Sequence, residues 1–131
     1  MTDFTARRLR AQRLIGKPFS SPVGVVRWLG AVQSQDYAGA KWAVAQRCGA
    51  TDATLDRLFD QGAILRTHVM RPTWHFVAPE DIRWLLDLTA PRVRAGLAGR
   101  YRRLEIDESV AARAAEAFAA ACACGHPSHG G

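Results

Sequence analysis

The chain has 131 residues, 48% of them hydrophobic and 23% charged, and its formal net charge is +6. This size and composition fit one globular domain, or one small domain and part of another. No apolar run approaches the roughly 20 residues that span a bilayer, and the N-terminus lacks the apolar core of a signal peptide. We therefore expect a cytoplasmic protein without membrane segments.

Arginine carries almost all of the positive charge, with sixteen arginines against two lysines. A guanidinium group suits phosphate because its planar fork donates two parallel hydrogen bonds, so the charge favours a nucleic-acid partner. The coding bias of a GC-rich genome would produce the same composition, and composition alone leaves both interpretations open. The cysteine count is three, and an odd number without a secretory signal predicts reduced thiols.

The first half of the chain carries local signals for helices. Residues 5–15 are predicted to form a basic helix that ends at Gly16. A second helix begins at Ser21, an N-cap followed by proline. Its apolar side chains recur at helical spacing and form one stripe, made of Val25, Trp28, Leu29 and Val32.

The middle of the chain changes from helical to strand periodicity. Residues 39–46 fit either a short helix or a strand, and a third helix is predicted from residue 52 or 54 to Gln61. Two β-prone segments follow, residues 64–70 and 74–77, and the proline-containing run between them predicts a hairpin.

The last part of the chain is predicted to be helical. One helix opens at Pro79, another covers residues 92–104, and an alanine-rich helix capped by Asp107 reaches about Cys122. Residues 125–131 are predicted to be disordered. Helices followed by a hairpin are typical of a winged helix-turn-helix, so the expected fold is mainly α with a small β-hairpin.

Two glutamines, Gln33 and Gln35, follow the second helix directly. In an extended segment, residues two apart point to the same side, and each amide offers a donor and an acceptor, so the pair can hold one water molecule. Neither amide titrates. Their chemistry therefore requires a substrate that already has a good leaving group, and the alternative is a pair of surface glutamines that ends a helix.

Residues 29–36 (LGAVQSQD) and 66–75 (RTHVMRPTWH) together resemble the winged-helix DNA glycosylases of the AlkZ and YcaQ group, over roughly residues 5–122. Family members contain tandem winged-helix domains, and their catalytic motif is glutamine, an aliphatic residue, then glutamine or aspartate. Gln33 and Gln35 match its polar positions, whereas Ser34 replaces the aliphatic residue. Asp36 is interpreted as a local helix cap, pointing away from the glutamines, with a catalytic role as the alternative.

The resemblance implies hydrolysis of the N-glycosidic bond of purines alkylated at N3 or N7, including the unhooking of crosslinks. It implies double-stranded DNA as the partner of a monomer in the bacterial nucleoid, with no cofactor and no metal. The tryptophans are expected in the core rather than on base-stacking platforms, and metal binding by the histidines or by the cysteines near the C-terminus is not expected. The predicted DNA contacts come from the hairpin region: Arg66, His68, Arg71, Thr73 and His75.

Two domains are expected, a first winged helix over residues 1–90 and a linker helix with the truncated start of a second winged helix over residues 91–131. The segment from Cys122 onward is expected to depart from the family pattern, as in a truncated or frameshifted product. The competing hypotheses are a non-catalytic winged-helix DNA-binding module and a nonfunctional remnant.

Overall fold

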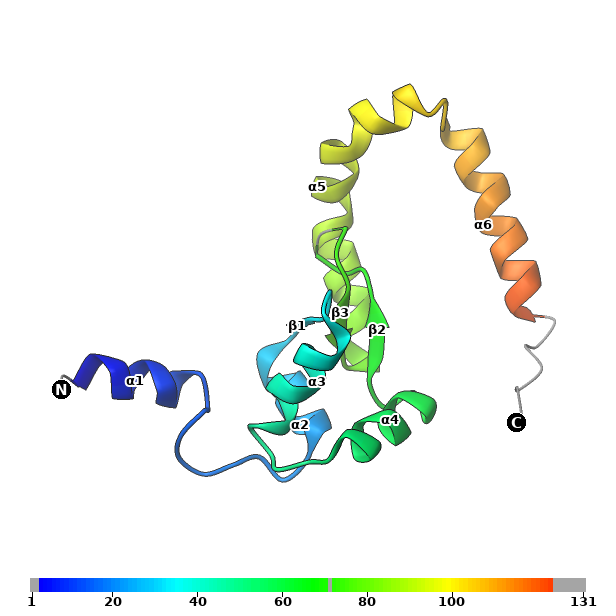
Figure 1. The fold of residues 1–131 in the computed structure, drawn as a ribbon. Coiled ribbons are helices and arrows are strands. Elements are labelled where there is room, and N and C mark those ends of the chain that lie inside the picture. The colour runs from blue at the N-terminus through cyan, green and yellow to red at the C-terminus, as the bar shows by residue number, and fades with distance from the viewer. Residues whose placement is uncertain (1–2, 71, 124–131) are drawn as a thin grey trace. The chain divides into compact units, whose positions relative to one another are not determined.

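The computed structural model describes residues 3–70 and 72–123, which fold mainly as helices with one small sheet (Figure 1). The chain divides into two compact units, Met1–Val93 and Arg94–Gly131. The elements in chain order are α1 (Asp3–Ala11), α2 (Pro22–Leu29), β1 (Val32–Gln33), α3 (Tyr37–Ala45), α4 (Asp52–Asp60), β2 (Leu65–Thr67), β3 (His75–Val77), the 3-10 turn η1 (Pro79–Asp81), α5 (Ile82–Arg103) and α6 (Glu108–Ala123).

The sheet of the first unit is antiparallel, with the strand order β1-β3-β2. Gln33 lies opposite His75 on β3, and Thr67 of β2 lies opposite the same histidine. The predicted hairpin is therefore present, although the strands are joined by residues 68–74 rather than by a tight turn. The succession of α2, β1, α3, α4, β2 and β3 is compatible with a winged helix.

The central strand β3 is buried on both faces. Phe76 joins the main core, where it contacts the rings of Tyr37 (5.6 Å between centroids) and Phe59 (4.7 Å). Val77 joins a smaller cluster with Leu85 of α5. Since burying each large apolar side chain stabilises the fold by about 1.5–3 kcal/mol, these two clusters hold the helices on the sheet.

Helix α2 begins where its sequence predicts but ends earlier, because Val32, predicted as the last residue of its apolar stripe, lies in β1. The Ser21 hydroxyl accepts a hydrogen bond from the Gly24 backbone N–H (3.2 Å), and Pro22 needs no partner in the first turn. Gly30 ends the helix with a φ of 74°, a conformation that favours glycine. This ending releases the chain directly into β1 and the glutamine pair.

Three predictions about helices need adjustment. The first helix ends at Ala11 rather than at residue 15, and Arg13 takes a left-handed φ of 56° soon afterwards. Residues 39–46, open between helix and strand, belong to α3 apart from Gln46, which caps it. The two helices predicted on either side of Pro91 form one, α5, because proline removes only one backbone hydrogen bond and its site on α5 is exposed.

The expectation that the tryptophans pack in the core is wrong. Trp28, Trp42, Trp74 and Trp84 are 37–68% exposed. The core instead consists mostly of smaller aliphatic side chains around Phe76. Trp28 packs at the edge of the fold against the Phe19 ring, 5.8 Å between centroids, because helical spacing selects a side of the helix but not the depth of burial.

The second unit contains the end of α5 and the helix α6. Asp107 begins α6, as predicted, by accepting a hydrogen bond from the Val110 backbone N–H at 2.8 Å. Whether this unit starts a second winged helix stays a prediction, and the tail predicted to be disordered lies outside the described residues. Across the described ranges, no helix is long and apolar enough to cross a membrane.

Candidate active site

Where the chain leaves the sheet, the side chains of the glutamine motif alternate between solvent and the interior. Gln33 ends β1, and both Gln33 and Gln35 are exposed, whereas Ser34 between them is completely buried. The Ser34 hydroxyl oxygen has no hydrogen-bond partner among the described residues. The middle position of the motif is therefore enclosed by the fold and does not use the hydroxyl group, so an aliphatic residue would be suited to it.

Gln33 and Gln35 line one open depression of about 320 Å³. Its other walls are residues 36, 39, 40 and 43, from the first turns of α3 and the loop before it. The structure thus brings together the two amides that the sequence predicts as catalytic. A water molecule held between them would be open to a substrate from solvent.

The backbone of Trp74 fixes the orientation of Gln35. The Trp74 backbone N–H donates to the Gln35 side-chain oxygen at 3.3 Å, and the Ser34 backbone N–H donates to the Trp74 carbonyl at 2.8 Å. Because a backbone N–H can only donate, the atom of Gln35 that faces it must be the amide oxygen. The NH₂ group of Gln35 remains for other partners.

Asp36 caps α3, as predicted, and also lines the depression. One of its carboxylate oxygens accepts a hydrogen bond from the Gly39 backbone N–H at 3.1 Å. An uninterrupted strand would point Asp36 away from the glutamines, whereas here the chain enters α3 directly after this residue, and Asp36 lines the same depression as both glutamines.

Arg66 is committed to contacts within the protein. Its guanidinium donates to the Ser34 carbonyl at 3.0 Å and lies over the rings of Trp74 (4.6 Å) and Tyr37 (5.4 Å). Its Nε is buried without a hydrogen-bond partner among the described residues. Arg66 therefore supports the loop of Ser34 and the Trp74 ring, and only part of its side chain is open to phosphate.

The other predicted DNA contacts differ in exposure. His75 is 2% exposed, and its Nδ1 lies 2.9 Å from the Thr73 carbonyl, which requires a proton on that nitrogen. His68 is exposed and packs against Trp74, with 4.1 Å between ring centroids and the rings tilted by 46°. Thr73 is half-buried, and Arg71 lies outside the described residues. We therefore assign no direct DNA contact to His75.

Trp74 lies at the candidate site, although its sequence pattern predicted a position in the core. Its ring is 37% exposed and contacts both Arg66 and His68, while its backbone holds the glutamine motif. Its place between Thr73 and His75 in the second motif could have indicated that Trp74 belongs to the site. A polar and aromatic surface beside two amides suits a nucleobase, since every base can stack on an aromatic face.

Two of the three aspartates of α4, Asp52 and Asp56, pair with a buried lysine of α3. The Lys41 ammonium, only 7% exposed, lies 2.6 Å from Asp52 and 2.8 Å from Asp56. Hydrogen bonds to these carboxylates, first Asp52 and then Asp56, raise the pKa of Lys41 despite its burial. The pKa of Tyr37 beside them is raised chiefly by burial. These ion pairs fasten α4 to α3, so that α4 has a structural role.

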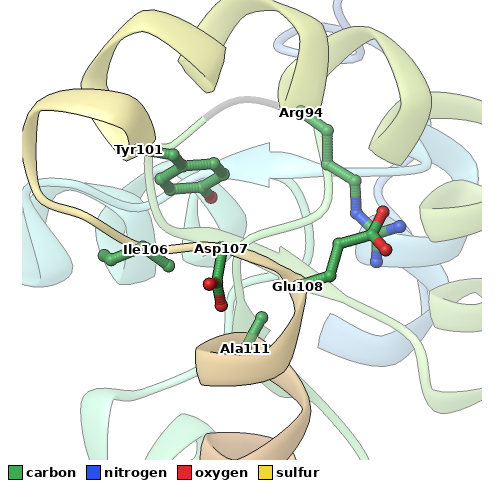
Figure 2. A pocket seen from close by; sticks show the side chains of 6 residues that line it. All are labelled: Arg94, Tyr101, Ile106, Asp107, Glu108 and Ala111. Atoms are coloured by element: carbon green, nitrogen blue, oxygen red, sulfur yellow. The ribbon is translucent and has the colours of Figure 1, made fainter.

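A larger pocket of about 550 Å³ lies in the unit Arg94–Gly131, where Figure 2 shows its six lining side chains. It forms where α5 turns into α6, and it contains none of the predicted site residues. Its carboxylate Asp107 accepts hydrogen bonds from the Val110 backbone and from the Ser109 hydroxyl, which lower the pKa of Asp107. The capping of α6 thus accounts for the Asp107 carboxylate, which lines this pocket together with the charged side chains of Arg94 and Glu108.

The comparisons with known proteins connect this geometry to a family. The family model of the AlkZ-like DNA glycosylases matches residues 26–130, which include both motifs and continue through the segment expected to depart from the family. No curated protein and no solved structure gave a match. Since the match covers most of the chain, the protein belongs to the AlkZ-like DNA glycosylase family, with DNA as the partner that this membership implies.

Proposed function

We propose that this protein hydrolyses the N-glycosidic bond of purines alkylated at N3 or N7 in double-stranded DNA. The observation that carries the proposal is the shared depression of Gln33 and Gln35, two exposed amides that flank a buried residue. In this proposal the amides position the attacking water and stabilise the positive charge that develops on the deoxyribose.

The chemistry of the lesion fits the weakness of amides as bases. A purine alkylated at N3 or N7 carries a positive charge, so its bond to the sugar breaks with the purine leaving as a neutral molecule. Positioning of water and electrostatic stabilisation then supply the remaining acceleration without a strong base. A purine joined to the opposite strand through an alkyl crosslink at N7 presents the same charged leaving group.

The DNA would lie along the hairpin side of a winged helix. The exposed His68–Trp74 pair offers a stacking surface next to the depression, and Arg66 adds positive charge behind it. The net charge of +6 predicts that affinity falls as salt rises, because binding releases counterions from the phosphates. Affinity that does not change between low and moderate salt would contradict this arrangement.

The test is release of N7-methylguanine from alkylated duplex DNA by the wild-type chain and by a Gln33→Ala, Gln35→Ala variant. We expect release by the wild type and a loss of at least about 100-fold in the variant, the range typical of removed positioning or electrostatic groups. A matched control is Gln46→Ala, which changes an exposed glutamine outside the depression. Equal release by all proteins would refute the catalytic assignment, and binding without release would instead show a non-catalytic DNA-binding module.

A further inference from the structure

We propose that Asp36 is a third catalytic residue, whose carboxylate accepts the proton of the water that attacks the sugar. This inference rests on the proposed function and deepens it. Asp36 is the only titratable residue among the six that line the depression, since the others are two glutamines, one glycine and two alanines. A reaction that adds water and releases a neutral purine must pass one proton to some acceptor.

The hydrogen bonds around the depression give its polar groups different roles as donors and acceptors. The amide oxygen of Gln35 already accepts from the Trp74 backbone, and its NH₂ group can act only as a donor. This donor can hold the oxygen of a water molecule but cannot take its proton. Gln33 offers an amide oxygen, which accepts a hydrogen bond but remains a poor base at neutral pH.

Asp36 is held in place while part of its carboxylate stays available. One oxygen accepts from the Gly39 backbone N–H, and the carboxylate is exposed at the rim. The second oxygen lies over Gly39, where an added Cβ would approach it to 2.4 Å. Glycine at this position therefore leaves room for the carboxylate, and the cap restricts its rotation without using both oxygens.

The bond between C1′ and the purine nitrogen breaks, and its electron pair cancels the positive charge of the purine. The water oxygen forms a bond to C1′, and one water proton passes to the Asp36 carboxylate and then to solvent. In the transition state the negative carboxylate also stabilises the positive charge that develops on the sugar.

The decisive variant is Asp36→Asn, because asparagine caps helices as well as aspartate but cannot act as a base. With protein in excess over DNA that carries N7-methylguanine, we expect the single-turnover release rate to fall about 100-fold. The dissociation constant for that DNA and the melting temperature should stay at wild-type values. A purely structural role would instead lower the melting temperature or weaken binding along with the rate.

Two further variants make the comparison specific. Asp107→Asn makes the same change at the start of α6, at a residue that does not line the depression, and should release the base at the wild-type rate. Asp36→Ser retains a capping hydroxyl and should be as slow as Asp36→Asn. A fall of less than threefold in Asp36→Asn, with an active wild type, would overturn this inference alone. Absence of release by the wild type would overturn the proposed function and this inference with it.

Discussion

The substitution Ser34→Ala is expected to stabilise the protein. Ser34 is completely buried, and its hydroxyl has no hydrogen-bond partner among the described residues. An unpaired buried hydroxyl costs about 1–3 kcal/mol, whereas alanine fills nearly the same space without a polar atom. We therefore expect the free energy of unfolding to rise by about 1–2 kcal/mol. The rate of base release should not change, because this side chain faces away from the two glutamines.

Urea unfolding followed by tryptophan fluorescence measures this effect, since all four tryptophans lie in the unit Met1–Val93. Ser21→Ala is the matched control, because the Ser21 hydroxyl accepts a hydrogen bond from the Gly24 backbone and caps α2. This control should lose about 1 kcal/mol. A rise in the free energy of unfolding for Ser34→Ala together with a fall for Ser21→Ala would support the reasoning. A loss of stability in Ser34→Ala similar to that in Ser21→Ala would refute it.

Three other substitutions test the surroundings of the site. Lys41→Met should lower the free energy of unfolding by about 1–2 kcal/mol in urea titrations, because it leaves two carboxylates of α4 unpaired and these are partly screened by solvent. The pKa of Lys41 is raised in the fold. The contribution of its ion pairs to the free energy of unfolding should therefore be fully present below the unfolded-state pKa of about 10.4, and it should be lost as pH rises through the folded-state pKa. Gly39→Ala should slow base release by displacing Asp36, whereas Gly96→Ala, with open space around its Cβ, should only stabilise its helix, by about 0.5–1 kcal/mol in thermal melts. Trp74→Ala should weaken binding to lesion DNA by about 1–3 kcal/mol in fluorescence anisotropy, and unchanged affinity would exclude base stacking at this ring.

Features that depend on neighbouring residues could be predicted from the sequence. Ser21 and Pro22 mark the start of α2, because capping and backbone preferences act over a few residues. The pairing of residues 65–67 with 75–77 follows from two β-prone segments close in the chain. The continuity of α5 through Pro91 could not be predicted in this way, since the cost of one lost hydrogen bond is weighed against packing of the whole helix.

The burial of individual side chains was less predictable. The apolar stripe of α2 identifies Val25 as a core residue, and Val25 is completely buried. The same stripe includes Trp28, which is 46% exposed. Helical spacing gives the direction of a side chain, whereas its depth depends on how the other elements close over it. The same reason explains why His75, predicted to contact DNA, lies inside the fold.

The sequence by itself determined that Gln33 and Gln35 point to one side, with Ser34 opposite, because alternation is a property of any extended backbone. It also indicated Asp36 as a local helix cap, although it left open whether residues 39–46 form a helix or a strand. Only the tertiary structure decided what these groups can do. The hydrogen bond that orients Gln35 comes from Trp74, 39 residues later in the chain, because β3 pairs with β1. The turn into α3 then places Asp36 among the residues that line the depression shared by both glutamines, a position that residue spacing alone did not predict.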